Sequence, residues 1–213
     1  YKCNITGLDI CKNMIDICKE RLKDNKISYI NIDYIDYETN NKFDLILCRD
    51  VLLYMYTEKK YDLIFGDAYY SRYSIPAHLS TKEFFELSKS KLTDEGIFMG
   101  NFLGRFGDTA PSILLSEIKT FQEVFPNSYY IATSKQKFDG YQNVVFIGYN
   151  SDRKVDFSDL AIREHENITI SGIAEHLVDI GSLDLTEHIL FTDNYAPVDY
   201  LTAKAIKNTK TAE

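Results

Sequence analysis

Short apolar runs alternate with amphipathic stretches along residues 1–150. An apolar run of about four to eight residues between turn residues is typical of a buried strand, and longer amphipathic stretches are typical of helices. This alternation predicts an α/β fold with a doubly wound, mostly parallel sheet. We expect residues 1–150 to form that domain and residues 151–213 to form a mostly helical extension packed on it.

The predicted strands are residues 5–10, 28–33, 43–48, 62–66, 96–101, 128–133 and 144–149. The last two lie close together and predict an antiparallel pair near the C-terminal edge of the sheet. One apolar motif occurs twice, as KFDLIL at 42–47 and KYDLIF at 60–65. Two buried strands can look alike because both need β-formers, and a junction between two related halves would also produce the repeat.

Helices are predicted at 12–22, where the apolar residues share one face, and from Ser80 through residue 92. Ser80 and Glu83 form the capping box of the second of these helices. Pro111 suits the first turn of another helix that runs to about residue 124. Residues 191–200 are predicted to be irregular, followed by a solvated basic tail that carries Lys204, Lys207 and Lys210.

The composition excludes several classes of protein. Lys+Arg 24 against Asp+Glu 32 gives a net charge of −8, which disfavours a nucleic-acid binder because such affinity depends on neutralising phosphates. No run approaches the roughly 20 apolar residues that a membrane helix needs, so we expect no membrane segment in this chain. The cysteines lack metal-ligand spacing, which predicts no metal and a reducing, cytoplasmic compartment.

Acidic residues follow several of the predicted strands, where ligands bind in open α/β sheets. They are Asp9, Asp33, Asp50 and Asp67. Asp9 suits an acid that accepts hydrogen bonds from both ribose hydroxyls of a nucleotide, and a helix cap is the alternative. Asp33 or Asp50 is expected to receive the adenine amino group, the other being a cap.

Asp67 is the candidate catalytic residue. It follows a strand that its composition predicts to be buried, and a carboxylate there can take a proton from an attacking amine. Tyr69 or Tyr70 beside it can hold a cation by ring and hydroxyl together. His78, in the loop that follows, can line a substrate pocket. A structural cap is the alternative for Asp67, and the remaining histidines are predicted on solvated surface: His165, His176 and His188.

Several segments carry distinctive motifs: YDLIFGDAY (61–69), IPAHL (75–79), TKEFF (81–85), FQEVFP (121–126) and FTDNYAPVDY (191–200). Together, and with further similarity over 92–104, they resemble the spermidine synthase family, and most of all its transporter-fused branch. The resemblance implies a class I methyltransferase-like Rossmann fold and aminopropyl transfer from decarboxylated S-adenosylmethionine to a small-molecule amine. Asp67 then stands at the position of the family's catalytic aspartate.

Two departures from the family pattern concern the substrate. Tyr70 stands where the well-studied members carry a second acid, which argues against a diamine acceptor. Asp193 and Asn194 stand where the branch usually has paired acids, and Tyr195 beside them is a further candidate for substrate binding.

Residues 5–15, 31–33 and 43–46 resemble small-molecule methyltransferases instead, which implies S-adenosylmethionine as co-substrate. Asp33 contacts adenine in that register, and Asp50 does so in the spermidine synthase register. Both families begin with a strand and a glycine-rich turn. This chain is expected to lack both and to be a fragment or a recombined product, so that an inactive chain is one of the alternatives.

The sequence therefore favours an aminopropyltransferase. A methyltransferase that acts on a small molecule is the second hypothesis, motivated by the N-terminal part. The third is a non-catalytic domain that binds a nucleoside or supplies a scaffold surface, and a homodimer is a further expectation.

Overall fold

The computed structural model describes residues 5–9, 11–23, 26–32, 60–67, 76–134 and 140–210. The chain divides into two compact units. Unit 1 comprises residues 1–44 and 54–57, and unit 2 comprises residues 45–53 and 58–213. Each unit contains strands joined by helices, so the predicted α/β class is confirmed. The predicted boundary near residue 150 stays a prediction.

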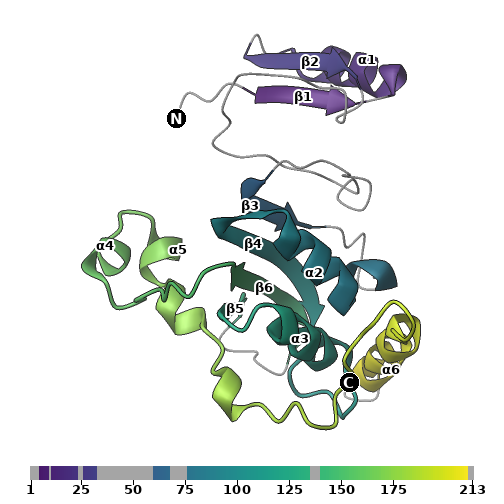
Figure 1. The fold of residues 1–213 in the computed structure, drawn as a ribbon, viewed down its shortest axis with the longest axis vertical. Helices are drawn as coiled ribbons and strands as arrows, with labels where there is room; N and C mark the ends of the chain where they lie inside the picture. Colours follow the sequence, from purple (N-terminus) through teal and green to yellow (C-terminus); the bar gives the residue numbers. More distant parts are fainter. Residues whose placement is uncertain are drawn as a thin grey trace. The chain divides into compact units, whose positions relative to one another are not determined.

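Unit 1 contains a strand–helix–strand element: β1 (Ile5–Asp9), α1 (Lys12–Arg21) and β2 (Ile27–Asn31). The two strands pair in parallel, with Ile5 opposite Ile27 and Asp9 opposite Asn31. Ile15 of α1 is buried. α1 connects the two parallel strands and packs against both of them (Figure 1).

In the described part of unit 2, four strands form a sheet: β3 (Tyr61–Gly66), β4 (Leu92–Gly104), β5 (Ser128–Ala132) and β6 (Gln142–Tyr149). Their order is β3-β4-β6-β5. β3 and β4 are parallel, whereas β6 is antiparallel to both of its neighbours. The predicted antiparallel pair is confirmed, β4 extends beyond the predicted 96–101 at both ends, and the predicted strand 43–48 lies outside the described residues.

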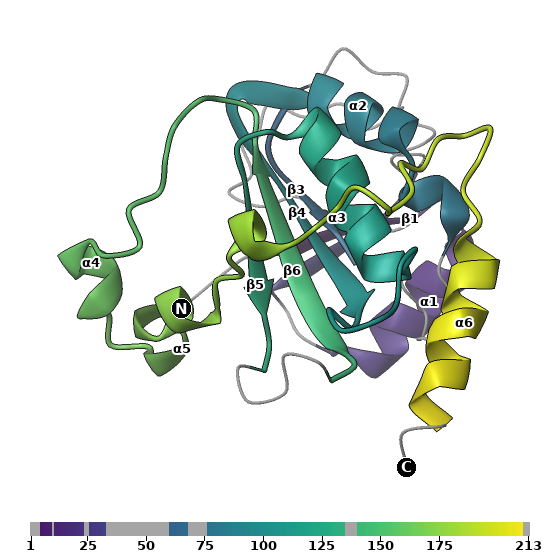
Figure 2. The same ribbon diagram turned by 90° about the horizontal axis from the view of Figure 1, so that it is seen from below.

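Among the described residues of unit 2, the helical elements are η3 (Ala77–Leu79), α2 (Lys82–Ser90), α3 (Ile113–Val124), α4 (Leu160–Arg163), α5 (Ile168–Ser171), η4 (Ile173–His176), η5 (Ile180–Ser182) and α6 (Val198–Lys210). α2 and α3 lie side by side on one face of the sheet (Figure 2). α4 and α5 project from the sheet on the side away from α6 (Figures 1 and 2).

Aromatic side chains fill the space between the sheet and the two helices. The fully buried rings are Phe85, Phe98, Phe121, Phe125, Tyr130 and Phe146. Glycines let the layers approach: a Cβ on Gly104 would lie 2.6 Å from the Leu114 Cβ, and one on Gly148 would lie 2.5 Å from the Phe125 Cγ. The even-numbered residues of β4 therefore face α2 and α3, and the odd-numbered residues face the other side.

The predicted capping box is wrong in its details. Thr81, not Ser80, caps α2, because its Oγ1 accepts the Phe84 amide at 3.3 Å. The Ser80 hydroxyl instead donates to Oε1 of the buried Glu117 at 3.2 Å, and Glu83 binds a distant backbone amide. α2 ends at Ser90 rather than at residue 92 because Leu92 already begins β4.

Two further predicted boundaries are corrected. Pro111 precedes α3 rather than lying in its first turn, since Ser112 is the cap and its Oγ accepts the Leu115 amide. α6 begins at Val198, inside the stretch 191–200 that was expected to be irregular. Lys204 belongs to this helix and not to a frayed tail.

Candidate functional site

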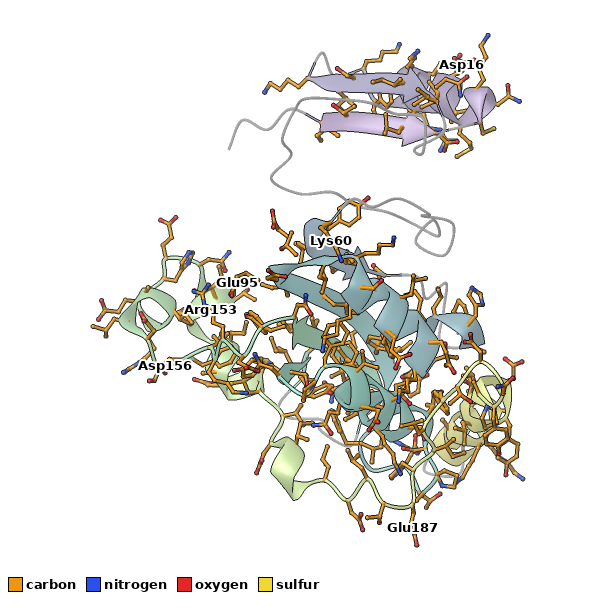
Figure 3. The ribbon with its side chains drawn as sticks, in the orientation of Figure 1. Asp16, Lys60, Glu95, Arg153, Asp156 and Glu187 are labelled. Atoms are coloured by element: carbon orange, nitrogen blue, oxygen red, sulfur yellow. The ribbon has the colours of Figure 1, made fainter. Side chains whose placement is uncertain are left out.

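The carboxyl ends of β3 and β4 meet at one edge of the sheet because the two strands are parallel. α2 follows β3 and α3 follows β4, so the N-termini of both helices lie at this edge. We call this edge the β3–β4 rim and define it as Asp67, Asn101 and the segments 76–81, 105–112 and 191–197. Lys60 and Glu95, labelled in Figure 3, lie at the opposite end of these strands.

Asp67 lies at the β3–β4 rim directly after β3, and its side chain is exposed. The Asn101 side chain, on β4, donates from Nδ2 to Oδ1 of Asp67 at 3.1 Å. The register explains the contact: Gly66 lies opposite Gly100, so the residues that follow them are neighbours. An exposed carboxylate fixed at one oxygen can accept a proton or a cation at the other.

The glycine before Asn101 is required by the core, whereas a Cβ on Gly66 would lie an ordinary 3.5 Å from Phe98 Cζ. A Cβ on Gly100 would lie 2.6 Å from Phe102 Cε2 and 3.0 Å from Phe98 Cε1. The two phenylalanine rings therefore occupy the space that a side chain at Gly100 would need. This packing fixes β4 at Gly100 and with it the position of Asn101.

Residues 189–191 are tied to α3 and to the start of α2. The backbone amides of Ile189 and Phe191 donate to the hydroxyls of Ser116 and Thr120, at 3.1 Å and 2.9 Å. The Phe191 carbonyl accepts the Lys82 amide at 2.9 Å. The buried hydroxyls of α3 thus accept hydrogen bonds from a chain segment that lies far away in the sequence.

Asp193 binds two residues at the start of α2. Its Oδ1 accepts the Thr81 hydroxyl at 2.7 Å, and its backbone amide donates to Glu83 Oε2 at 3.0 Å. These bonds bring the segment 191–197 to the β3–β4 rim, where α2 begins.

Two predicted substrate-binding residues, His78 and Tyr195, lie in segments that pack together. Ala77 and Ala196, their neighbours in the chain, both contact the buried cluster of Ile113, Phe191, Val198, Leu201 and Ala205. His78 is exposed, and Tyr195 is 61% exposed. Both side chains are therefore accessible to a ligand from solvent.

The loop after β4 forms another part of the rim. Arg105 and Asp108 form an ion pair, and Arg105 Nε donates to Asp108 Oδ1 at 3.0 Å. The Lys204 ammonium of α6 donates to the carbonyls of residues 109, 110 and 111 at 2.9 Å, 3.1 Å and 3.0 Å. α6 therefore holds this loop in place, which the prediction of a solvated tail missed.

His188 is buried rather than on solvated surface. The Ser112 amide donates to its Nδ1 at 3.1 Å, which assigns the proton of the neutral ring to Nε2. Burial lowers the pKa of His188 below its ordinary value of 6.5, and the Lys119 charge acts in the same direction. His176 is also half-buried, with Nδ1 2.7 Å from the Ala132 carbonyl, whereas His165 is exposed as predicted.

In unit 1, Asp9 lies at the end of β1. Its Oδ1 accepts the backbone amide of Cys11, the residue that precedes α1, at 2.7 Å, and its carbonyl accepts Asn31 Nδ2 at 2.9 Å. The carboxylate thus stabilises the turn into α1 but does not cap the helix, because Cys11 is the N-cap residue of α1. Binding of ribose by Asp9 stays a prediction.

The other predicted site residues, Asp33, Asp50, Tyr69 and Tyr70, lie outside the described residues. In the part of the chain that is described, no group of three or more His, Cys, Asp or Glu side chains is placed to hold a metal ion. Within the same residues, no helix combines the length and the apolar character that crossing a bilayer requires.

Asn101 is the residue of the rim that the sequence reasoning missed. The available signal was the pair of Gly–polar steps, Gly66-Asp67 and Gly100-Asn101, at the ends of two predicted strands. Recognising it required the register of the pairing between β3 and β4, which the apolar pattern does not contain.

The N-terminal part of the chain matches a known family. Residues 1–70 match the family described as "Methyltransferase domain". No curated protein matches the chain.

Solved structures with similar folds include both enzyme classes that the sequence suggested. A probable spermidine synthase from Corynebacterium glutamicum is 15% identical with a TM-score of 0.47, covering 75% of this chain and 51% of its own. The spermidine synthase from Thermotoga maritima is 12% identical (TM-score 0.41; 82% and 56% covered). Human methyltransferase-like protein 13, in complex with SAH, is 17% identical (TM-score 0.40; 68% and 60% covered).

The chain thus spans about half the length of the Corynebacterium and Thermotoga proteins.

Proposed function

We propose that the chain is a spermidine synthase-like aminopropyltransferase, with decarboxylated S-adenosylmethionine as co-substrate and a small-molecule amine as acceptor. The observation that supports this most is the exposed carboxylate of Asp67 at the end of β3, held at one oxygen by Asn101. A second support is the resemblance of residues 61–69 to the segment that carries the catalytic aspartate of the spermidine synthase family.

The proposed reaction is a direct displacement. The amine nitrogen attacks the propyl carbon bound to the sulfonium sulfur, and the C–N bond forms as the C–S bond breaks. The sulfur keeps the electron pair and leaves as methylthioadenosine, and Asp67 takes the proton from the nitrogen. Holding the amine and the propyl carbon in line supplies much of the rate acceleration.

His78 and Tyr195 are proposed to contact the acceptor amine. They lie in segments joined by the buried cluster beneath the β3–β4 rim, and both side chains are exposed to solvent. The tyrosine offers a ring face and a hydroxyl to an ammonium group. In this proposal they bind the acceptor, whereas Asp67 acts on the reacting nitrogen.

A small-molecule methyltransferase that uses S-adenosylmethionine is the second candidate. It is favoured by the match of residues 1–70 to the methyltransferase domain family. The methyl group would then pass to the acceptor, and S-adenosylhomocysteine would be released in place of methylthioadenosine.

The two candidates differ in their co-substrate, so one experiment separates them. The purified chain is incubated with each co-substrate and a panel of mono- and polyamines, and the nucleoside products are separated by chromatography. We expect methylthioadenosine from the decarboxylated form and no S-adenosylhomocysteine from the other. The opposite pattern overturns the proposal in favour of a methyltransferase. No product, together with no binding of methylthioadenosine in calorimetry, supports a scaffold domain.

A further inference from the structure

Asn101 occupies a position where an apolar residue would be expected. It lies on the face of β4 that does not contact α2 and α3, between Met99 and Leu103 and opposite Val145 of β6. The Asn101 side chain is half-buried, and its amide donates to the Asp67 carboxylate. The amide therefore has a partner at the rim rather than in the core.

We propose that Asn101 is a positioning residue for the base Asp67, an inference that rests on the proposed aminopropyl transfer. Asn101 Nδ2 donates to Oδ1, so this oxygen is occupied and the carboxylate cannot turn freely about its side-chain bonds. Oδ2 is then the oxygen that receives the proton of the attacking amine. Because Gly66 pairs with Gly100, the backbone holds donor and acceptor in register.

A fixed carboxylate matters for the reaction because the acceptor must lie in line with the breaking C–S bond when its proton is removed. Removing the amide takes away the hydrogen bond that fixes Oδ1 of the exposed Asp67 side chain. The Asp67 carboxylate then samples orientations in which it does not face the amine. This loss affects the chemical step and leaves the binding of the nucleotide unchanged.

The test compares Asn101→Leu, which keeps the shape of the side chain but removes the donor, with Asn143→Leu as the matched control. Asn143 is also a strand asparagine near the end of the sheet, and it is exposed. We expect Asn101→Leu to lower kcat about ten- to a hundredfold, the effect of losing one hydrogen bond to a charged group. KM for decarboxylated S-adenosylmethionine should stay within about twofold. Asn143→Leu should match the unmodified chain.

Asn101→Asp supplies a readout that a merely structural residue would not move. Two carboxylates at hydrogen-bonding distance do not both ionise readily, so the acidic limb of the pH–rate profile should move to higher pH. An unchanged profile, or an unchanged kcat in Asn101→Leu, overturns the positioning role.

The reference variant Asp67→Asn separates this inference from the proposed function. Turnover lost in Asp67→Asn but kept in Asn101→Leu refutes the positioning role alone, whereas turnover kept in Asp67→Asn refutes the proposed function. If the chain shows no turnover, NMR of the Asn101 side-chain amide decides the geometry. Its signals should follow protonation of Asp67 as the pH falls, and unresponsive signals overturn the inference.

Discussion

Replacing Phe121 with alanine removes the ring at the centre of the core of unit 2. Phe121 is fully buried, and its ring centroid lies 4.8 Å from that of Phe125, 5.0 Å from Phe85 and 5.4 Å from Phe146. Truncating such a ring costs about 3–5 kcal/mol through lost burial and the cavity left behind. We expect the upper part of that range, because several edge-to-face and stacked contacts are lost together.

The assay is urea unfolding of the full chain, with far-UV circular dichroism as the probe of the transition. A domain is stabilised by about 5–15 kcal/mol in total, so Phe121→Ala can leave too little folded protein to measure. Phe121→Leu is therefore measured as well, and its loss of unfolding free energy should be roughly a third to a half of the loss in Phe121→Ala. Tyr200→Ala is the control, because Tyr200 is 67% exposed and should change the unfolding free energy by no more than about 0.5 kcal/mol. A loss below about 1 kcal/mol in Phe121→Ala would refute the packing described.

Two further predictions concern the segments that support the rim. Burial lowers the pKa of His188 in the folded chain below 6.5. As the pH falls through 6.5, the histidine therefore takes up a proton more readily in the unfolded chain than in the folded one. The contribution of His188 to the unfolding free energy should be complete above that pH and decrease below it. His188→Gln should flatten this decrease in a series of melting temperatures against pH, whereas His165→Gln should leave it unchanged. Lys204→Met removes the donor to three carbonyls and should cost about 1–2 kcal/mol in thermal unfolding, while a Lys207→Met variant that loses as much would contradict the specific role of Lys204.

The strands could be predicted because their signal is local. The apolar run that forms β3 ends at Gly66-Asp67, and the predicted and observed strands end at the same residue. The end of α3 at Val124 also agrees with the prediction, since Pro126 follows shortly afterwards and cannot continue a helix. Local patterns therefore located the rim and its acid.

Features that depend on distant contacts could not be predicted in this way. Ser80 and Thr81 are both suitable caps, and the choice is decided by Glu117, which takes the Ser80 hydroxyl from 37 residues away. The buried ring of His188 finds its hydrogen-bond partner in the amide of Ser112, 76 residues earlier. The contact of Asn101 with its partner likewise needed the strand register.

The central claim is that the Asp67 carboxylate removes the proton from an amine at the β3–β4 rim. The most direct measurement compares Asp67→Asn with Asp62→Asn, an exposed acid on the same strand, by following methylthioadenosine release and nucleotide binding in the same preparations. The account predicts that Asp67→Asn abolishes release while binding survives, and that Asp62→Asn behaves as the unmodified chain. Undiminished release from Asp67→Asn would contradict it.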